Sequence, residues 1–141
     1  MWLYAGIMAL VVLPMLSSCA KEPINRKIEG HWILESFTLQ ENGEEVVCER
    51  IYWGITRVGA KMMEKQGPHH YPPISALVEY RNHERTLVLK DIRQGQHTAT
   101  KEQMHPYGLD NAEESVFEVI ESTHKRMILE SDYARLYLRK F

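Results

Sequence analysis

Residues 28–55 read IEGHWILESFTLQENGEEVVCERIYWGI, and this stretch decides the fold class. Its two halves are rich in β-branched and aromatic residues, which favour strands. Between them stands Asn42-Gly43, the strongest short signal for a hairpin, because both central residues of a type I′ turn need positive φ. The stretch therefore predicts antiparallel strands over residues 31–39 and 45–53, joined by a type I′ turn.

The rest of the chain repeats this pattern of short strands separated by turn residues. Gly54 is expected to bend the second strand, which then continues over residues 55–64 with its even-numbered positions on the more apolar face. Further strands are predicted over residues 74–80, 85–92, 116–121, 126–131 and 133–141. About eight strands, with no helical period of useful length, predict an all-β fold, either a sandwich or an up-and-down antiparallel barrel.

The longest stretch without periodicity spans residues 93–114. A structureless segment of this length is unusual in a compact domain and is typical of a lid or a binding loop. Within it we expect at most a short strand around residues 97–101, followed by a turn cluster at residues 105–109.

An uncharged apolar run covers residues 1–16 and leads into the tetrapeptide LSSC, whose last residue is Cys19. The tetrapeptide resembles a bacterial lipobox, in which the Cys receives the lipid. This predicts a lipoprotein signal peptide over residues 1–18, a lipidated Cys with a flexible tether over residues 19–27, and a barrel domain over residues 28–141. Acyl chains such as palmitate would then hold the domain at a membrane. No Lys or Arg precedes the apolar run, so either the true start lies upstream or the positively charged region of the signal is weak. An uncleaved N-terminal anchor helix is the alternative to a signal peptide.

The residues after Cys19 bear on which membrane the anchor would enter. Lys21 and Glu22 stand where lipoproteins of the Bacteroides type carry an acidic run that resembles a surface-export signal. The Asp that retains enteric lipoproteins in the inner membrane is absent as well. We therefore expect a lipid-anchored protein of the cell envelope, in the outer membrane and facing the periplasm.

Three motifs beyond the tether resemble the lipocalin-like lipoproteins of Bacteroides-type bacteria. They are G-x-W-x-L at residues 30–34, the turn PYGL at residues 106–109, and the closing pattern of apolar positions from Phe117 to Lys140. The resemblance implies a small up-and-down β-barrel of about eight strands, with an internal or end-on site for an apolar molecule.

The aromatic residues leave two functions open. If the barrel holds a cavity, strand phase selects Trp53, Val58, Met62, Tyr80 and Leu89 as its walls, and the protein would bind a small apolar ligand there. If the same side chains fill the interior, the barrel is an interaction module. It would then dock on another cell-envelope protein through its longest loop or its strand edges.

Composition and spacing argue against other classes of function. The formal net charge of −2 comes without a basic stripe, so we expect no nucleic-acid partner. Neighbours on an extended chain point to opposite sides, so His69-His70 is a poor metal site, and the other histidines are expected to be solvated. The sequence has neither a phosphate-cradling glycine loop nor a nucleophile elbow, so we expect no enzyme and no cofactor.

Two cysteines complete the inventory. With Cys19 assigned to the lipid, Cys48 has no partner and is expected to be a buried, inert thiol. A Cys19–Cys48 disulfide is the alternative, and it would require Cys19 not to be acylated.

Overall fold

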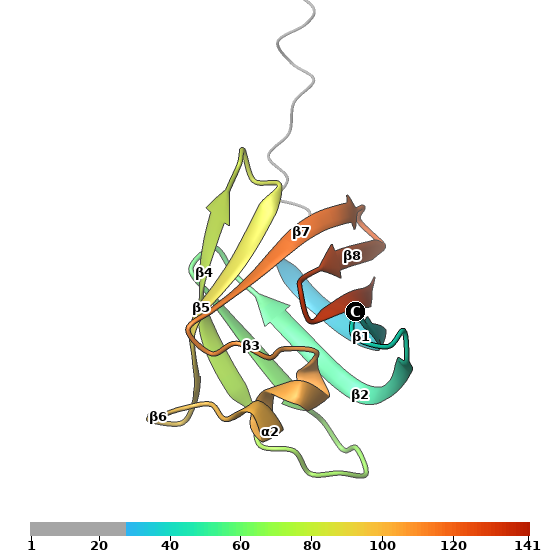
Figure 1. The fold of residues 1–141 in the computed structure, drawn as a ribbon, viewed down its shortest axis with the longest axis vertical. Helices are drawn as coiled ribbons and strands as arrows, with labels where there is room; N and C mark the ends of the chain where they lie inside the picture. Colours follow the sequence, from blue (N-terminus) through green and yellow to red (C-terminus); the bar gives the residue numbers. More distant parts are fainter. Residues whose placement is uncertain (1–27) are drawn as a thin grey trace, which may run out of the picture.

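The computed structural model describes residues 28–141, which form a closed antiparallel barrel of eight strands (Figure 1). The strands are β1 (Gly30–Leu39), β2 (Glu45–Ile55), β3 (Gly59–Glu64), β4 (Ile74–Arg81), β5 (Thr86–Gln94), β7 (Glu114–Ser122), β8 (Arg126–Glu130) and β9 (Ala134–Lys140). Pairing of β1 with β9 and of β4 with β5 closes the sheet on itself. The predicted up-and-down barrel is confirmed. The signal peptide, Cys19 and the tether lie outside the described residues.

The first hairpin forms as predicted, but its turn is of another kind. Five residues, 40–44, separate the strands, and the loop is closed by the bond from Leu39 N to Glu44 O, at 2.9 Å. Only Gly43 takes a positive φ, of 73°, whereas a type I′ turn would require it of Asn42 as well. The Asn42 side chain instead accepts a bond from Glu44 N, at 2.9 Å. The type I′ prediction is therefore wrong.

The predicted continuous strand over residues 55–64 is also wrong, because a turn divides it. β2 runs straight through Gly54 and ends at Ile55, and β3 begins at Gly59. Thr56 closes the turn, since its hydroxyl donates to Gly59 O at 3.0 Å and accepts from Gly59 N at 3.1 Å. The Thr56 hydroxyl thus stabilises a turn at residues 56–58, whereas the prediction from Gly54 was a bend within a continuous strand.

Residues 93–114, predicted as a lid or a binding loop without regular structure, contain more secondary structure than the sequence indicated. They contain β6 (His97–Thr98), the helix α2 (Lys101–Met104) and the 3-10 turn η3 (His105–Tyr107). The short strand predicted near residue 97 is confirmed. Thr100 and Gln103 form a capping box that starts α2, and Gly108, with φ of 82°, ends η3.

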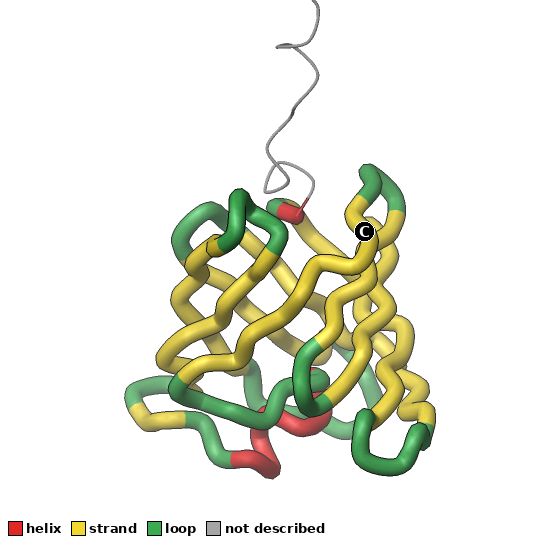
Figure 2. Tube along the Cα trace, turned by 45° about the horizontal axis from the view of Figure 1, so that its top comes forward, coloured by secondary structure: helices red, strands yellow, loops and turns green. Residues whose placement is uncertain are grey.

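Because the strands run up and down, successive turns alternate between the two ends of the barrel (Figure 2). The end that holds Ile28 and the turns at residues 56–58, 82–85 and 123–125 is called the base here. The end that holds residues 40–44, 95–113 and 131–133 is called the rim, and α2 lies there. The described chain enters at the base, so the rim is its far end.

Candidate functional site

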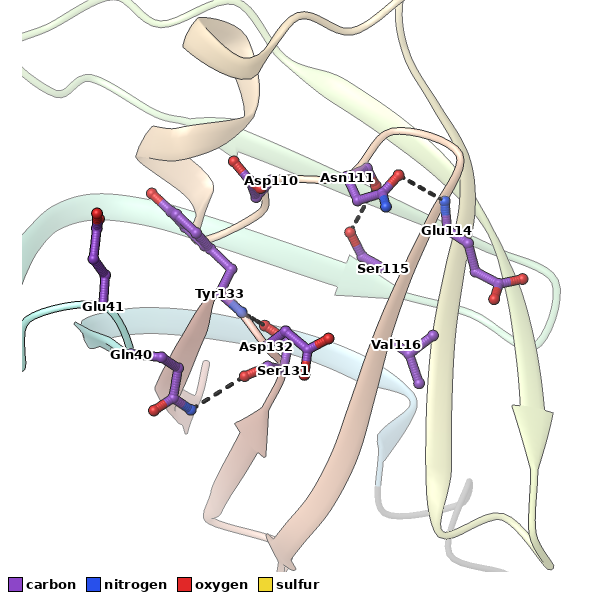
Figure 3. Close-up of a pocket in the computed structure, with 10 residues that line it drawn as sticks. All are labelled: Gln40, Glu41, Asp110, Asn111, Glu114, Ser115, Val116, Ser131, Asp132 and Tyr133. Atoms are coloured by element: carbon purple, nitrogen blue, oxygen red, sulfur yellow. Dashed lines mark hydrogen bonds between the residues drawn. The ribbon is translucent and has the colours of Figure 1, made fainter.

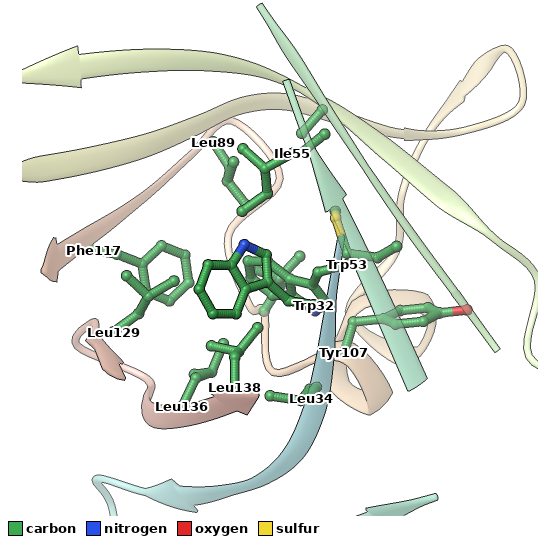
Figure 4. Close-up of a cluster of buried hydrophobic side chains, with 14 of the residues drawn as sticks. Trp32, Leu34, Trp53, Ile55, Leu89, Tyr107, Phe117, Leu129, Leu136 and Leu138 are labelled. Carbon is green, nitrogen blue, oxygen red and sulfur yellow. The ribbon is translucent and has the colours of Figure 1, made fainter. Parts of the chain in front are cut away.

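Four of the five predicted wall residues belong to the hydrophobic core or pack against it. Figure 4 shows Trp53 and Leu89 among the buried side chains. Trp53, Met62 and Leu89 are fully buried, and Tyr80 is half-buried against the same core. Trp53 and Met62 are direct cross-strand partners in β2 and β3. Trp53 also meets Phe117 of β7 edge to face, with ring centroids 6.0 Å apart.

Val58 was placed wrongly among these walls. Its side chain is 72% exposed, because Val58 lies in the turn between β2 and β3 rather than on a strand. The alternation that puts every second side chain inside a barrel applies only within a strand. The turn made by Thr56 therefore removes Val58 from the interior.

Both ends of the barrel are covered by buried side chains. At the base, the Trp32 indole N–H donates to the carbonyl of Ile28, at 2.7 Å, and both side chains are fully buried. At the rim, Met104 and Tyr107 are buried, and the Tyr107 hydroxyl donates to Pro72 O, at 3.0 Å. The segment that was expected to be a lid or a binding loop thus packs onto the core and is hydrogen-bonded to the loop between β3 and β4.

A cleft with a volume of about 520 Å³ opens at the rim, beside this cover (Figure 3). Its walls come from the turn after β1, the segment that leads into β7 together with the first residues of β7, and the turn between β8 and β9. It is lined by Gln40, Glu41, Asp110, Asn111, Glu114, Ser115, Val116, Ser131, Asp132 and Tyr133. This is called the rim cleft below.

The charge of the rim cleft has one sign. Four carboxylates line it, and none of the described lining residues is a lysine or an arginine. Asp110 and Glu114 are paired with cations outside the lining: Lys101 Nζ lies 3.6 Å from Asp110 Oδ2, and Arg81 Nη2 lies 2.9 Å from Glu114 Oε2. Glu41 and Asp132 form no ion pair with any described residue.

One wall of the rim cleft is aromatic. The Tyr133 ring stacks on His105, with centroids 5.0 Å apart and planes 13° apart. His105 Nε2 lies 2.7 Å from Asp110 Oδ1, so the imidazole is held in place by this contact. The sequence had predicted a solvated His105 without such a partner. Burial raises the pKa of the Tyr133 hydroxyl, and the carboxylates of Asp110 and Glu41 raise it further. Tyr133 therefore stays a neutral hydrogen-bond donor.

Hydrogen bonds within and between its segments fix the polar lining of the rim cleft (Figure 3). The Ser115 hydroxyl donates to Asn111 O, at 2.7 Å. Gln40 donates to Ser131 O, at 3.1 Å, and the Ser131 hydroxyl accepts from Tyr133 N, at 3.2 Å. Because these groups are already hydrogen-bonded, a partner would bind a preformed surface. The entropy cost of ordering these side chains on binding would therefore be small.

No sequence motif predicts the rim cleft, but the order of the predicted strands does indicate which turns lie close together. In an up-and-down barrel, alternate turns share one end. The turn after the first predicted strand, the segment 93–114 and the turn before the last strand are therefore neighbours. All three segments carry Asp or Glu. Because they lie at the same end of the barrel, Glu41, Asp110 and Asp132 line one cleft.

Three further observations concern the described residues. Residues 28–141 bring together no group of three His, Cys, Asp or Glu side chains that could hold a metal ion. Cys48 carries a free thiol, and desolvation by burial raises its pKa to about 12. No helix in the described part of the chain is long and apolar enough to cross a membrane.

Comparison with known proteins identifies the family. The model of the Lipocalin-like domain matches residues 14–141. An uncharacterized protein from Bacteroides eggerthii has a similar solved structure, with a TM-score of 0.60 and 19% identity over 80% of this chain and 98% of that one. A lipocalin-like protein from Bacteroides uniformis has a TM-score of 0.60 and 14% identity, over 82% of this chain and 99% of that one. No curated protein matches the chain. The chain thus belongs to the lipocalin-like domain family, and its barrel is consistent with a ligand-binding or interaction module.

Proposed function

We propose that the protein is exported and lipid-anchored through Cys19 at the periplasmic face of the outer membrane. The lipobox-like LSSC and the polar stretch after it support this proposal. The geometry is compatible with it, because the described chain enters at the base and leaves the rim free. Anchored in this way, the barrel would present the rim cleft to the periplasm.

Cellular fractionation of two single-cysteine variants tests the anchor. Cys19→Ser should move the protein from the membrane fraction to the soluble fraction and abolish the mass increase of acylation. Cys48→Ser is the matched control and should leave both unchanged. Release of neither variant, or of both, would refute the assignment of the lipid to Cys19.

We further propose that the protein is a non-catalytic interaction module that binds a cationic segment of another envelope protein in the rim cleft. The packing of Trp53, Met62 and Leu89 in the barrel core carries this proposal, because it fills the place where an apolar ligand was expected. The rim cleft is preformed, and its carboxylates at Glu41 and Asp132 form no ion pair with any described residue. Lysine or arginine side chains supply the complementary charge.

The strength expected of such a contact is modest. Glu41 and Asp132 are exposed, and an exposed ion pair contributes about 0.2–1 kcal/mol. A short basic peptide should therefore bind weakly and lose affinity as salt rises. A tight complex would need further contacts along the rim, such as the Tyr133 ring and the bonded amides.

Tri-lysine and tri-glutamate peptides are the probes for the rim cleft. We expect tri-lysine to bind at low ionic strength and tri-glutamate not to bind. Glu41→Gln with Asp132→Asn should weaken tri-lysine binding roughly three- to tenfold. Glu49→Gln with Glu118→Gln changes the net charge equally outside the cleft and is the control. Equal losses in the two double variants would show that only net charge matters and would contradict the cleft.

One observation favours binding of a small apolar ligand inside the barrel as a second candidate function. The indole nitrogen of Trp53 and the hydroxyl of Tyr80 are buried without a hydrogen-bond partner among the described residues. Such groups would suit a ligand with a polar handle, because a buried donor without a partner costs about 1–3 kcal/mol. Native mass spectrometry of the protein from its source organism tests this candidate. A co-purifying apolar molecule supports it, and the mass of the protein alone counts against it.

A further inference from the structure

A second recess lies on the outer face of β1, β2 and β3, away from the rim cleft. It consists of two adjoining hollows of about 270 and 210 Å³, which share Tyr52, Lys65 and Phe141 as lining residues. The recess is called the outer groove below. Nothing in the function proposed above uses it.

The floor and one wall of the outer groove are apolar. Phe141 follows β9 and is 70% exposed, yet its ring is held edge to face against Tyr52, with centroids 5.4 Å apart. The bond from Phe141 N to His31 O, at 2.9 Å, fixes the backbone that carries this ring. Met63 lines the same floor beside Tyr52, its cross-strand partner. The Phe141 ring is thus exposed to solvent but held in one orientation by Tyr52. An exposed aromatic side chain of this kind is typical of a contact surface.

The border of the outer groove is cationic. Arg50, Lys61 and Lys65 line it, and none of its described lining residues is an aspartate or a glutamate. Arg50 donates from Nε to Lys65 O, at 2.8 Å, which places its guanidinium beside the groove. None of the three cations forms an ion pair within residues 28–141.

We propose that the outer groove binds an organic anion with an apolar body. The apolar body would lie against Tyr52 and Phe141, and the anionic group would meet Lys61 and Lys65. Charge complementarity decides this choice of ligand. A neutral apolar ligand would leave the cations unused, and a cation would be repelled by all three. The proposal is independent of the rim cleft, whose charge has the opposite sign.

Three small probes separate the contributions of charge and apolar contact. They are 1-naphthoate, 1-naphthylmethylammonium and inorganic phosphate, and each is titrated into the protein with detection by NMR chemical shifts. We expect 1-naphthoate alone to shift the signals of Tyr52, Met63 and Phe141. Equal binding of the ammonium probe would overturn the role of the cations. Equal binding of phosphate would overturn the role of the apolar floor.

Matched variants then test the residues. Lys61→Gln with Lys65→Gln, and separately Phe141→Ala, should each weaken 1-naphthoate binding at least fivefold. Arg57→Gln with Arg85→Gln is the control, because these two exposed cations lie on turns at the base and have no ion pair among the described residues. Unchanged affinity in the groove variants, or an equal loss in the control, would refute the site. The neutral substitutions Glu41→Gln and Asp132→Asn in the rim cleft should leave 1-naphthoate binding unaffected. The experiments on the two sites therefore test the two proposals independently.

Discussion

The ammonium nitrogen of Lys140, the last residue of β9, lies 4.6 Å from the ring centroid of Trp32 in β1. The same nitrogen donates to the carbonyl of Glu29, at 3.1 Å. The indole N–H of Trp32 in turn donates to Ile28 O, at 2.7 Å. One aromatic ring thus joins the last strand, the first strand and the entering chain, and this closes the base.

Replacing Lys140 by Met should lower the free energy of unfolding by about 1 kcal/mol. The change keeps most of the aliphatic stem over Trp32 but removes the cation–π contact and the bond to Glu29 O. Urea unfolding followed by tryptophan fluorescence measures the effect. Lys125→Met is the control, because the exposed Lys125 side chain makes no hydrogen bond or ion pair within residues 28–141. An equal loss in the control would contradict the account of the base.

At the rim, Tyr107→Phe should cost about 1 kcal/mol of stability. The hydroxyl of Tyr107 donates to Pro72 O, and the substitution removes this bond while keeping the buried ring. Hydrogen exchange should rise in the loop between β3 and β4. Tyr137→Phe is the matched control, since the described residues offer that hydroxyl no partner. Unchanged exchange in the loop of Tyr107→Phe would show that the bond does not hold the rim cover.

Acid should loosen the same loop through Glu64. Desolvation opposes ionisation of this carboxylate, but the backbone N–H groups of His69 and Tyr71 outweigh it and lower its pKa below the ordinary 4.5. A carboxylate with a lowered folded-state pKa stabilises the protein above its unfolded-state pKa, and this stability is lost as pH falls through the folded-state value. Glu64→Gln should therefore lower stability at pH 7 and make it less sensitive to pH below 4.5. Glu118→Gln should keep the acid sensitivity of the parent. If the Glu64→Gln variant also keeps the acid sensitivity of the parent, this sensitivity does not come from Glu64.

Cys48 should react slowly with thiol reagents in the folded protein. Desolvation raises the pKa of its thiol from 9.0 to about 12, so the reactive thiolate is rarer by a factor on the order of a thousand. The reaction of a Cys19→Ser variant with a chromogenic disulfide at pH 8 measures this. We expect the rate to recover in urea as the protein unfolds. Fast reaction in native buffer would contradict the environment described for Cys48.

The strands could be predicted from the sequence because they depend on local patterns. β-Branched and aromatic runs, together with turn residues, located the barrel strands, except that β2 and β3 were predicted as one continuous strand. The turn at residues 56–58 could not be predicted in the same way. It depends on two hydrogen bonds of the Thr56 hydroxyl, and threonine is common inside strands. That one omission placed Val58 inside the barrel.

The candidate site was harder to predict, because its parts are distant in sequence. Glu41 and Asp132 line one cleft although about 90 residues separate them, and only closure of the barrel brings their turns together. The order in residues 93–114 was missed for a related reason. Met104 and Tyr107 are isolated apolar residues without periodicity, and their burial against the core becomes visible only in three dimensions.

In the function proposed here, the partner binds at the rim and not in the barrel interior. The most direct test is an NMR titration of the protein with tri-lysine, observing the backbone amides of Asn111, Ser115 and Asp132 and the indole N–H of Trp53. We predict that the three rim amides shift with one common affinity while the Trp53 indole signal stays in place. A shift of the Trp53 indole signal with unmoved rim amides would contradict the account.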